Sequence, residues 1–203
     1  IGSENPKSLQ RMQHLYGPFV RQGNPILEMD TASAEVTKYA ANSYLATRIT
    51  YMNELANFCE AVGADVDLVR RGMGTDNRIG KRFLFAGIGY GGSCFPKDTK
   101  ALARIGQEHA VPMQITETVI TVNEEIKRRM ITKLEDLCDG TFNGKIIAML
   151  GVTFKPDTDD MRDAPSLDII PLLQAAGATI RAYDPEGMEQ AARLLADPGD
   201  FVV

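Results

Sequence analysis

Apolar residues recur every three to five positions along most of the first 140 residues, and this spacing predicts a chain built mainly from helices. The longest such stretch runs from Thr31 to Val62, with neither Gly nor Pro until Gly63. A helix of about 30 residues would be about 45 Å long at 1.5 Å per residue. That length exceeds what a small domain needs, so we expect the helix to join two domains or to pack against a partner chain.

Shorter helices are predicted on both sides of the long one. The first begins at Asn5 and Pro6, because a side-chain acceptor followed by proline suits a helix N-terminus. A short strand is expected at Ile26–Met29, and a loop rich in glycine and charge runs from Gly74 to Ser93. The shorter helices are expected at 5–16, 65–71, 96–107 and 116–139.

After residue 144 the pattern changes to that of a parallel α/β fold. Lys145–Val152 is a continuous apolar run, as expected for a buried parallel strand. A helix, a strand and a helix are then predicted at 167–176, 179–183 and 187–196. This alternation is typical of a doubly wound, Rossmann-like domain, entered here but not completed. Residues 200–203 resemble the start of another buried strand, so we expect the sequence to be part of a longer protein.

The composition is that of an ordinary folded protein. Of its 203 residues, 44% are hydrophobic and 24% are charged, and the formal net charge is −5. An acidic chain offers no general attraction to phosphate backbones, so nucleic acid is not an expected partner. No apolar run approaches the roughly 20 residues of a membrane-spanning helix, and no signal segment opens the chain. We therefore expect a soluble, cytoplasmic protein without a membrane partner.

The cysteines and histidines indicate neither disulfides nor a metal site. Cys59, Cys94 and Cys138 are odd in number and widely spaced, which favours reduced thiols. His14 and His109 are isolated, so no metal is expected. Cys59 and Cys138 fall within helical patterns and are interpreted as small buried thiols.

Cys94 differs from the other two cysteines because it lies between a glycine-rich loop and a helix that begins Pro96-Lys97-Asp98. A helix N-terminus and a neighbouring lysine both favour the thiolate, which suggests a nucleophile; the alternative is a buried thiol. Either a tight turn or a close approach to a ligand would explain the glycines at 87, 89, 91 and 92. These glycines match G-x-G-x-x-G, but the strand and apolar helix of a dinucleotide site do not flank them.

Several polar residues elsewhere could serve a site or merely be solvated. Lys38 and Asn42 are four residues apart and therefore share one face of the long helix. Asp98 could complement the helix dipole or take part in chemistry. Lys155 and Arg162 follow the first strand of the last domain, where open α/β sheets bind ligands, and could meet phosphates.

Three motifs together resemble the nucleotide-sugar 6-dehydrogenases, the UDP-glucose/GDP-mannose dehydrogenase family, and most closely its members that oxidise UDP-glucose. The motifs are KYAAN at 38–42, GYGGSCFPKD at 89–98 and TFKPDTDDMR at 153–162. They occur in the order expected for the family, and the resemblance covers nearly the whole chain.

The resemblance implies an α/β protein in which a helical central domain joins two Rossmann-like domains and forms a homodimer. Residues 1–30 would be the tail of an NAD-binding domain and 31–140 the central dimerisation domain. Residues 144–203 would be part of the nucleotide-sugar-binding domain. The NAD fingerprint and a glutamate segment of the family are absent from the sequence, so we expect these 203 residues alone to be inactive.

The family's activity is an NAD-dependent, four-electron oxidation of UDP-glucose to UDP-glucuronate with two NAD and one water. Cys94 matches the nucleophile, which carries the sugar first as a thiohemiacetal and then as a thioester. Lys38 matches a lysine that stabilises an oxyanion, and Asn42 an asparagine that hydrogen-bonds the reacting oxygen. Asp98 matches an aspartate implicated in placing or activating the water.

The resemblance also implies which residues bind substrate and cofactor. Lys97 and Arg162 match positions that contact NAD. Arg78 matches an arginine that reaches the sugar nucleotide, in some relatives across the dimer. The residues that match substrate positions are Lys38, Asn42, Arg78, Phe83, Leu84, Phe85, Ala86, Gly87, Gly91 and Lys155.

Two alternatives remain at this stage. Within the enzyme class, the substrate could be GDP-mannose or a UDP-N-acetylhexosamine, although Tyr90 and the run from Pro96 to Asp98 favour UDP-glucose. Outside that class, the sequence could be a dimerisation or scaffold module.

Overall fold

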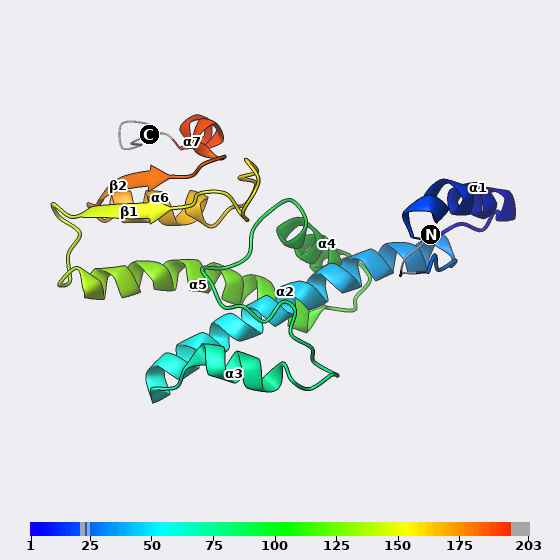
Figure 1. Cartoon of the computed structure of the whole chain (residues 1–203), viewed down its shortest axis with the longest axis horizontal. Helices are drawn as coiled ribbons and strands as arrows, with labels where there is room; N and C mark the ends of the chain where they lie inside the picture. The colour runs from blue at the N-terminus through cyan, green and yellow to red at the C-terminus, as the bar shows by residue number, and fades with distance from the viewer. Residues whose placement is uncertain (21–22, 24, 196–203) are drawn as a thin grey trace.

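The structure, a computed structural model, describes residues 1–20, 23 and 25–195. The strand start expected at 200–203 and the last residue of the helix expected at 187–196 lie outside these described residues. Figure 1 shows a long helix, α2, running through the molecule, with the two-stranded sheet lying beside a second long helix, α5. The elements are α1 (Pro6–Tyr16), the 3-10 helix η1 (Gly17–Phe19), α2 (Thr31–Val62), α3 (Val66–Met73), α4 (Phe95–Glu108), α5 (Gln114–Leu137), β1 (Ile146–Leu150), α6 (Ser166–Ala175), β2 (Thr179–Tyr183) and α7 (Met188–Leu194).

The predicted helices are confirmed to within a few residues, and the caps explain why. The Asp30 side chain accepts a hydrogen bond from the Ser33 N–H at 2.8 Å and begins α2. Gly63 ends the same helix in the left-handed conformation, with φ of 72°. No helix in the described part of the chain is both long and apolar enough to cross a membrane.

The strand expected at Ile26–Met29 is wrong. Of these four residues only Met29 forms a β-bridge, a single parallel one to Gly2, and the Leu27 carbonyl accepts from the N-terminal amine of Ile1. The Ser3 N–H donates to the Met29 carbonyl, and the Met29 N–H donates to the Ile1 carbonyl, each at 3.1 Å. The pairing does not continue into a strand, because the next residue, Asp30, is the N-cap of α2.

Helices α2, α4 and α5 pack on one another around a small core. Ala46 of α2, Tyr90 of the loop before α4 and Val119 of α5 are its buried members. Ile49 and Phe95 pack against them. This core places the N-terminus of α4, which carries Cys94, beside α2.

The last part of the chain is the expected parallel α/β unit. β1 pairs with β2 in register from Ile146 with Thr179 to Leu150 with Tyr183. The core here is built from residues of the two strands, α6, α7 and their loops. α5 contributes Met130, Ile131 and Leu134 to the same core, so this helix packs into both halves of the molecule.

The expectation that β1 is buried on both faces is wrong for the described residues. Ile146 is 57% exposed and Leu150 is 83% exposed, whereas Ile147 and Met149 face the core. Side chains alternate across a strand, so a single covered face buries only every second residue. An uninterrupted apolar run therefore predicts apolar side chains on both faces of the strand. In this chain the core covers only one of these faces.

Candidate active site

Asp98 lies at the centre of a polar cluster that contains three other predicted residues. It is 1% exposed and belongs to the first turn of α4. Asn42 of α2 donates through Nδ2 to Asp98 Oδ2 at 2.5 Å, and Lys97 donates through Nζ to Oδ1 at 2.5 Å. Lys38 Nζ lies 3.7 Å from Asp98 Oδ2. The fold thus brings Lys38 and Asn42 together with a carboxylate that is more than 50 residues away in the sequence.

The surroundings of Asp98 keep it ionised. Burial raises the pKa of this carboxyl, but the hydrogen bonds from Lys97 and Asn42 and the charge of Lys38 outweigh burial and hold the pKa below its usual value. Its hydrogen bond and charge in turn raise the pKa of Lys97. The cluster therefore holds a buried negative charge beneath two exposed lysines at neutral pH.

Cys94 is exposed, so the interpretation of this residue as a buried thiol does not hold. It precedes the first residue of α4, and its own carbonyl accepts from the Asp98 N–H at 2.8 Å. Cys59 is buried, as expected, and Cys138 is partly buried. Cys94 thus lies one helical turn before Asp98.

The thiol lies at an open hollow of about 610 Å³ on the surface. The residues around the hollow are Ser93, Cys94, Lys97, Arg162 and Asp163. It is therefore bordered by the N-terminal end of α4 and by the loop after β1, which are far apart in the sequence. Two cationic side chains share this hollow with the thiol.

Two glycines before Cys94 let the loop before α4 touch the last domain. The Gly92 N–H donates to the Arg162 carbonyl at 2.8 Å. A Cβ at Gly91 would lie 2.2 Å from the Asp163 carbonyl oxygen, and one at Gly92 would lie 2.6 Å from the ring of Phe154. These two glycines are therefore required by close approach to the chain's own backbone and side chains, in addition to any turn or ligand.

The motif at 153–162 supplies one of the two cations at the hollow, Arg162. Arg162 pairs with Asp160 at 2.6 Å, and this guanidinium lowers the pKa of Asp160 to about 2. Lys155 lies with Nζ 5.3 Å from the centre of the Phe154 ring. Both Lys155 and Arg162 thus lie on the loop that contacts the glycines before Cys94.

The segment predicted to bind the sugar nucleotide is only partly available to a ligand. The side chain of Leu84 is 2% exposed and belongs to the protein interior, so Leu84 could offer only its backbone. Phe83 and Phe85 are exposed, as are Ala86 and Gly87. Phe83 has a φ of 58°, an uncommon conformation for a residue with a side chain.

Arg78 lies apart from the cluster around Cys94. Its guanidinium donates to the carboxylate of Asp76 at 2.6 Å, and its side chain is 89% exposed. Asp76 raises the pKa of Arg78, and the guanidinium lowers the pKa of the carboxyl in return. Arg78 is not among the residues around the hollow at Cys94, so its role in binding the sugar nucleotide stays a prediction.

Three side chains that the sequence did not single out hold the loop between α3 and α4. Arg48 of α2 donates to three carbonyls of this loop, at 2.8 to 3.2 Å. Asn53 accepts from the Gly87 N–H at 2.7 Å, and Asn123 of α5 binds the backbone of Tyr90. In the sequence each of these residues is only a polar residue within a helical pattern. A single sequence does not show whether such a side chain binds a loop or faces solvent.

Asp184, which the sequence also did not single out, fixes the loop after β1. It is 5% exposed; one carboxylate oxygen accepts from Val152 and Thr153, the other from Glu186 and Gly187. Burial raises its pKa, but these backbone N–H groups outweigh burial and lower the pKa to about 2. The sequence feature that could have indicated Asp184 is its position directly after the strand predicted at 179–183.

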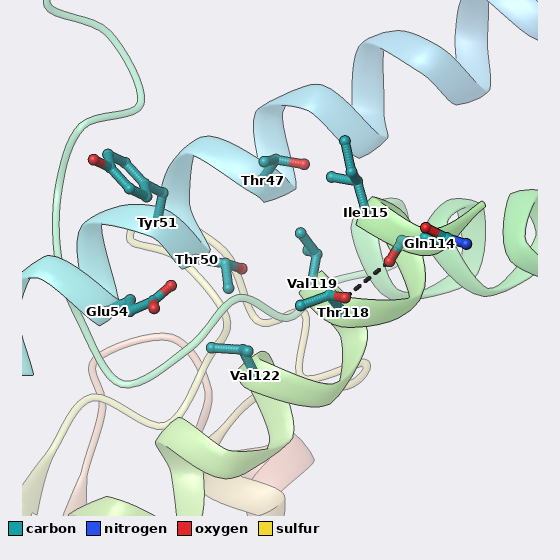
Figure 2. A pocket seen from close by; sticks show the side chains of 9 residues that line it. All are labelled: Thr47, Thr50, Tyr51, Glu54, Gln114, Ile115, Thr118, Val119 and Val122. Carbon is teal, nitrogen blue, oxygen red and sulfur yellow. Dashed lines mark hydrogen bonds between the residues drawn. The ribbon is translucent and has the colours of Figure 1, made fainter.

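A second hollow, of about 370 Å³, lies between α2 and α5 and contains none of the predicted site residues. Figure 2 shows Thr50 on α2 lying toward Val119 and Val122 on α5. Its full lining is Thr47, Thr50, Tyr51, Glu54, Gln114, Ile115, Thr118, Val119 and Val122. The candidate chemistry and this apolar hollow are thus separate features.

The groups around Cys94 suit phosphates better than a metal ion. Lys97 and Arg162 border the thiol and can each bind a phosphate oxygen. Both are paired with carboxylates, so a phosphate would compete with Asp98 and Asp160 for them. No group of three or more His, Cys, Asp or Glu side chains suited to hold a metal is found among the described residues.

Comparison with known families gives two matches along the chain. Residues 32–125 match the central domain of the UDP-glucose/GDP-mannose dehydrogenase family. Residues 148–201 match the UDP binding domain of the same family.

Individual relatives agree with these family matches. A UDP-glucose 6-dehydrogenase of Rhizobium meliloti is 46% identical over 195 residues, which cover 96% of this chain and 45% of the relative. The solved structure of a UDP-glucose dehydrogenase from Pyrobaculum islandicum has a TM-score of 0.93 and 35% identity, covering all of this chain and 46% of that one. An NDP-N-acetyl-D-galactosaminuronic acid dehydrogenase from Methanosarcina mazei has a TM-score of 0.77 and 31% identity, covering 91% of this chain and 41% of that one. The chain thus spans less than half the length of these relatives.

Proposed function

The chain belongs to the UDP-glucose/GDP-mannose dehydrogenase family, and on that premise we propose that it is part of an NAD-dependent enzyme that oxidises UDP-glucose to UDP-glucuronate. The observation that carries the proposal is the contact of Lys38 and Asn42 with Asp98, which lies one helical turn after the exposed Cys94. The relatives named UDP-glucose 6-dehydrogenase support the choice of sugar.

Oxidation of a primary alcohol to a carboxylate removes four electrons and adds one oxygen from water. NAD, when bound, would accept one hydride, so the two oxidation steps would use two molecules of NAD in succession. Cys94 Sγ bonds to C6 at the aldehyde level and gives a thiohemiacetal; at the next oxidation level this carbon is a thioester. Water then adds to the thioester carbonyl, the C–S bond breaks, and the products are the carboxylate, the thiol of Cys94 and a proton.

The other three residues have roles that follow from their charges. Lys38 is exposed and cationic, so it can stabilise the oxygen that becomes negative as C6 reacts. Asn42 can hydrogen-bond the same oxygen through the second N–H of its amide while the first donates to Asp98. Asp98 is a carboxylate with its pKa below the usual value, so it accepts hydrogen bonds and can orient the attacking water.

We further propose that the chain dimerises through α2. Tyr44, Tyr51 and Phe58 are each at least half exposed on this helix. They are spaced seven residues apart, so they form one aromatic stripe along a 32-residue helix. Aromatic residues of this kind are enriched at protein interfaces. In this scheme residues 1–30 are the tail of an NAD-binding domain, 31–140 form the dimerisation domain and 144–203 are part of the nucleotide-sugar-binding domain.

The test of the proposed reaction is the ratio of NADH formed to sugar consumed by the full-length gene product. Two NADH per UDP-glucose, with little from GDP-mannose or UDP-N-acetylglucosamine, is the expected result. Turnover of another sugar would keep the chemistry and change the substrate. Absence of NADH with all three sugars would overturn the proposal in favour of a scaffold. The 203-residue polypeptide assayed alone is expected to form no NADH, because the sequence carries no strand followed by the dinucleotide fingerprint.

A further inference from the structure

The loop that ends at Cys94 is attached to α5 at Tyr90 by one buried side chain. Asn123 is 3% exposed. Its Oδ1 accepts from the Tyr90 N–H at 2.8 Å, and its Nδ2 donates to the Tyr90 carbonyl at 3.1 Å. Both ends of the amide are thus used on a single residue of the loop, a pairing that needs a donor and an acceptor on one short side chain.

The position of Tyr90 affects that of Cys94, because the ring of Tyr90 packs on the residue next to Cys94. The ring packs edge-on against that of Phe95, with the ring centres 6.0 Å apart and the planes at 87°. Phe95 is the first residue of α4 and follows Cys94 directly. The backbone of Tyr90 is therefore held by α5, while its ring contacts the residue next to the thiol.

The glycines on either side of Tyr90 make such an attachment necessary. Gly89 and Gly92 have φ of 107° and 86°, which side-chain-bearing residues rarely adopt. A Cβ at Gly89 would lie 3.1 Å from Asn123 Oδ1, so the loop backbone runs directly against α5. A loop of glycines has few side chains to pack, so its position depends on hydrogen bonds to its backbone.

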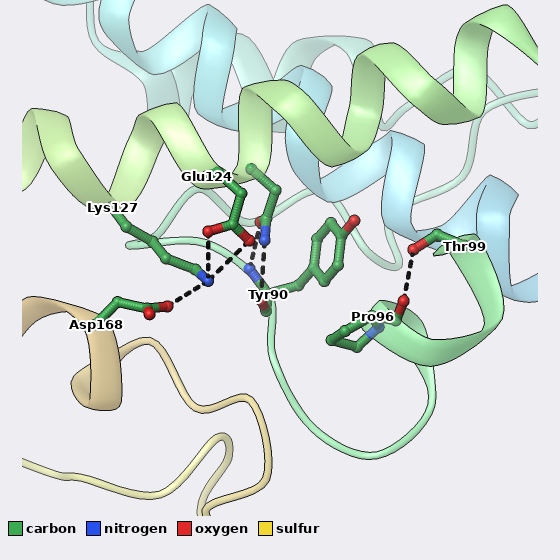
Figure 3. A network of polar contacts seen from close by, with 7 residues as sticks. Tyr90, Pro96, Thr99, Glu124, Lys127 and Asp168 are labelled. Carbon is green, nitrogen blue, oxygen red and sulfur yellow. Dashed lines mark hydrogen bonds and ion pairs between the residues drawn. The ribbon is translucent and has the colours of Figure 1, made fainter. Parts of the chain in front are cut away.

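Lys127, one turn after Asn123, joins the same part of α5 to the last domain. It is 5% exposed and donates to Asp168 of α6 at 2.6 Å and to Glu124 at 3.0 Å, as Figure 3 shows beside Tyr90. Burial lowers the pKa of Lys127, but the two carboxylates outweigh burial and raise it. Adjacent turns of α5 therefore hold both the loop before Cys94 and the domain that contacts that loop.

We propose that Asn123 is a positioning residue for the oxidation, acting through the backbone of Tyr90 to place Cys94 Sγ against the C6 carbon of the sugar. This inference rests on the proposed function. Small displacements of a reacting group reduce the rate of the chemical step more than they reduce binding. The loss of Asn123 should therefore lower kcat much more than it raises KM.

The experiment compares Asn123→Ala with wild type in the full-length gene product, using UDP-glucose and NAD. We expect kcat to fall by roughly 10 to 100-fold, since misplacement of about 1 Å has effects of that size, while KM stays within about threefold. Amide hydrogen exchange of the peptide that contains Tyr90 should become faster in the variant. Asn123→Asp, which keeps the acceptor and loses the donor, should give an intermediate kcat and serves if the alanine variant does not fold.

Ile126→Val is the matched control, because Ile126 is buried on the same helix and its side chain has no hydrogen-bonding group. It should lower the melting temperature while leaving kcat within about twofold of wild type. An unchanged kcat in Asn123→Ala would overturn the positioning role. So would a loss of kcat that is proportional to the loss of melting temperature in both variants. If wild type forms no NADH, the proposed function fails, and unchanged exchange at Tyr90 would separately refute the attachment.

Discussion

Asn42 and Asp98 are 56 residues apart in the sequence, yet the amide nitrogen of one lies 2.5 Å from a carboxylate oxygen of the other. This contact joins α2 to the first turn of α4 and buries the carboxylate. It also places the amide and the carboxylate of the proposed site in one hydrogen-bonded pair. Because an asparagine NH₂ group has two donors, Asn42 can donate one N–H to a ligand oxygen while the other stays on Asp98.

Replacing Asp98 with Asn should slow hydrolysis of the thioester more than formation of the covalent bond between Cys94 and the sugar. The variant loses the negative charge that orients water, so we expect kcat to fall by about 10²- to 10⁴-fold, the usual range for losing a proton-transfer group. Mass spectrometry of the quenched reaction should show a sugar adduct on Cys94. Glu108→Gln, at the other end of α4, is the control and should leave kcat unchanged. A wild-type rate for Asp98→Asn would refute the role.

Cys94→Ser should abolish UDP-glucuronate formation by the full-length gene product. A serine hydroxyl is a much weaker nucleophile than a thiolate at neutral pH, so the intermediate that needs the sulfur would not form. NADH and UDP-glucuronate should be measured together by chromatography. Cys138→Ala changes a partly buried thiol away from the site and should retain two NADH per sugar. UDP-glucuronate at the wild-type rate from Cys94→Ser would exclude covalent catalysis.

Gly91→Ala should destabilise the chain by about 1 to 3 kcal/mol, the usual cost of forcing extra volume into a packed region. The new Cβ would lie 2.2 Å from the Asp163 carbonyl oxygen, so one of the two loops must move. Gly87→Ala is the matched control, because a Cβ there meets nothing within 4 Å. Urea unfolding should place Gly87→Ala within about 0.5 kcal/mol of wild type. Equal stability of the two variants would contradict the packing of these loops.

Asp184→Asn should weaken the attachment between the loop after β1 and the end of β2. One of the two oxygens becomes an NH₂ group and faces backbone N–H donors, so we expect a loss of about 1 to 3 kcal/mol in the free energy of unfolding at pH 7. Leu194→Ala, an exposed residue of α7, should change stability much less. Urea denaturation measures both, and equal stability of Asp184→Asn and wild type would refute the attachment.

The same carboxylate predicts a pH dependence of stability. The pKa of Asp184 is lowered from 3.8 to about 2, which corresponds to about 2 kcal/mol. Because the folded-state pKa is the lower one, this stability is fully present above about pH 4 and is lost as the pH falls toward 2. The stability difference between wild type and Asp184→Asn should therefore be constant from pH 7 to 5 and shrink below pH 4. A difference that widens in acid would contradict the shift.

Tyr51→Glu should reduce self-association, because it places a charge in the middle of the aromatic stripe on α2. Sedimentation velocity should show a dimer for wild type and a larger monomer fraction for the variant. Tyr51→Phe keeps the apolar ring and should associate like wild type. A wild-type chain that stays monomeric at all concentrations would remove the support for an α2 interface.

Local patterns were sufficient to predict most of the helices and β2. Apolar spacing, Asp30 before α2 and Gly63 after it determine the ends of the longest helix, and all of these signals are local. The same method failed at Ile26–Met29, because a strand needs a neighbour and four apolar residues do not show whether one exists. It also missed the exposed face of β1, since burial depends on which elements cover the strand.

The site could be predicted only where its residues form motifs. Cys94 and Asp98 lie within one run, so their proximity follows from the first turn of α4. Asn53, Asn123 and Asp184 were missed because each binds backbone groups more than 30 residues away, and Asp184 also binds two close in sequence. A polar side chain that binds a distant N–H leaves no periodic signal of its own.

α5 contributes apolar side chains to two hydrophobic cores, which couples the unfolding of one core to that of the other. Val119 lies in the core with Ala46 and Tyr90, whereas Met130 and Leu134 pack against the core of the α/β unit. Opening either core exposes apolar residues of the same helix, so the loss of one lowers the stability of the other. The two halves should therefore melt in a single cooperative transition, and cutting the polypeptide near residue 143 should leave neither half with its full thermal stability.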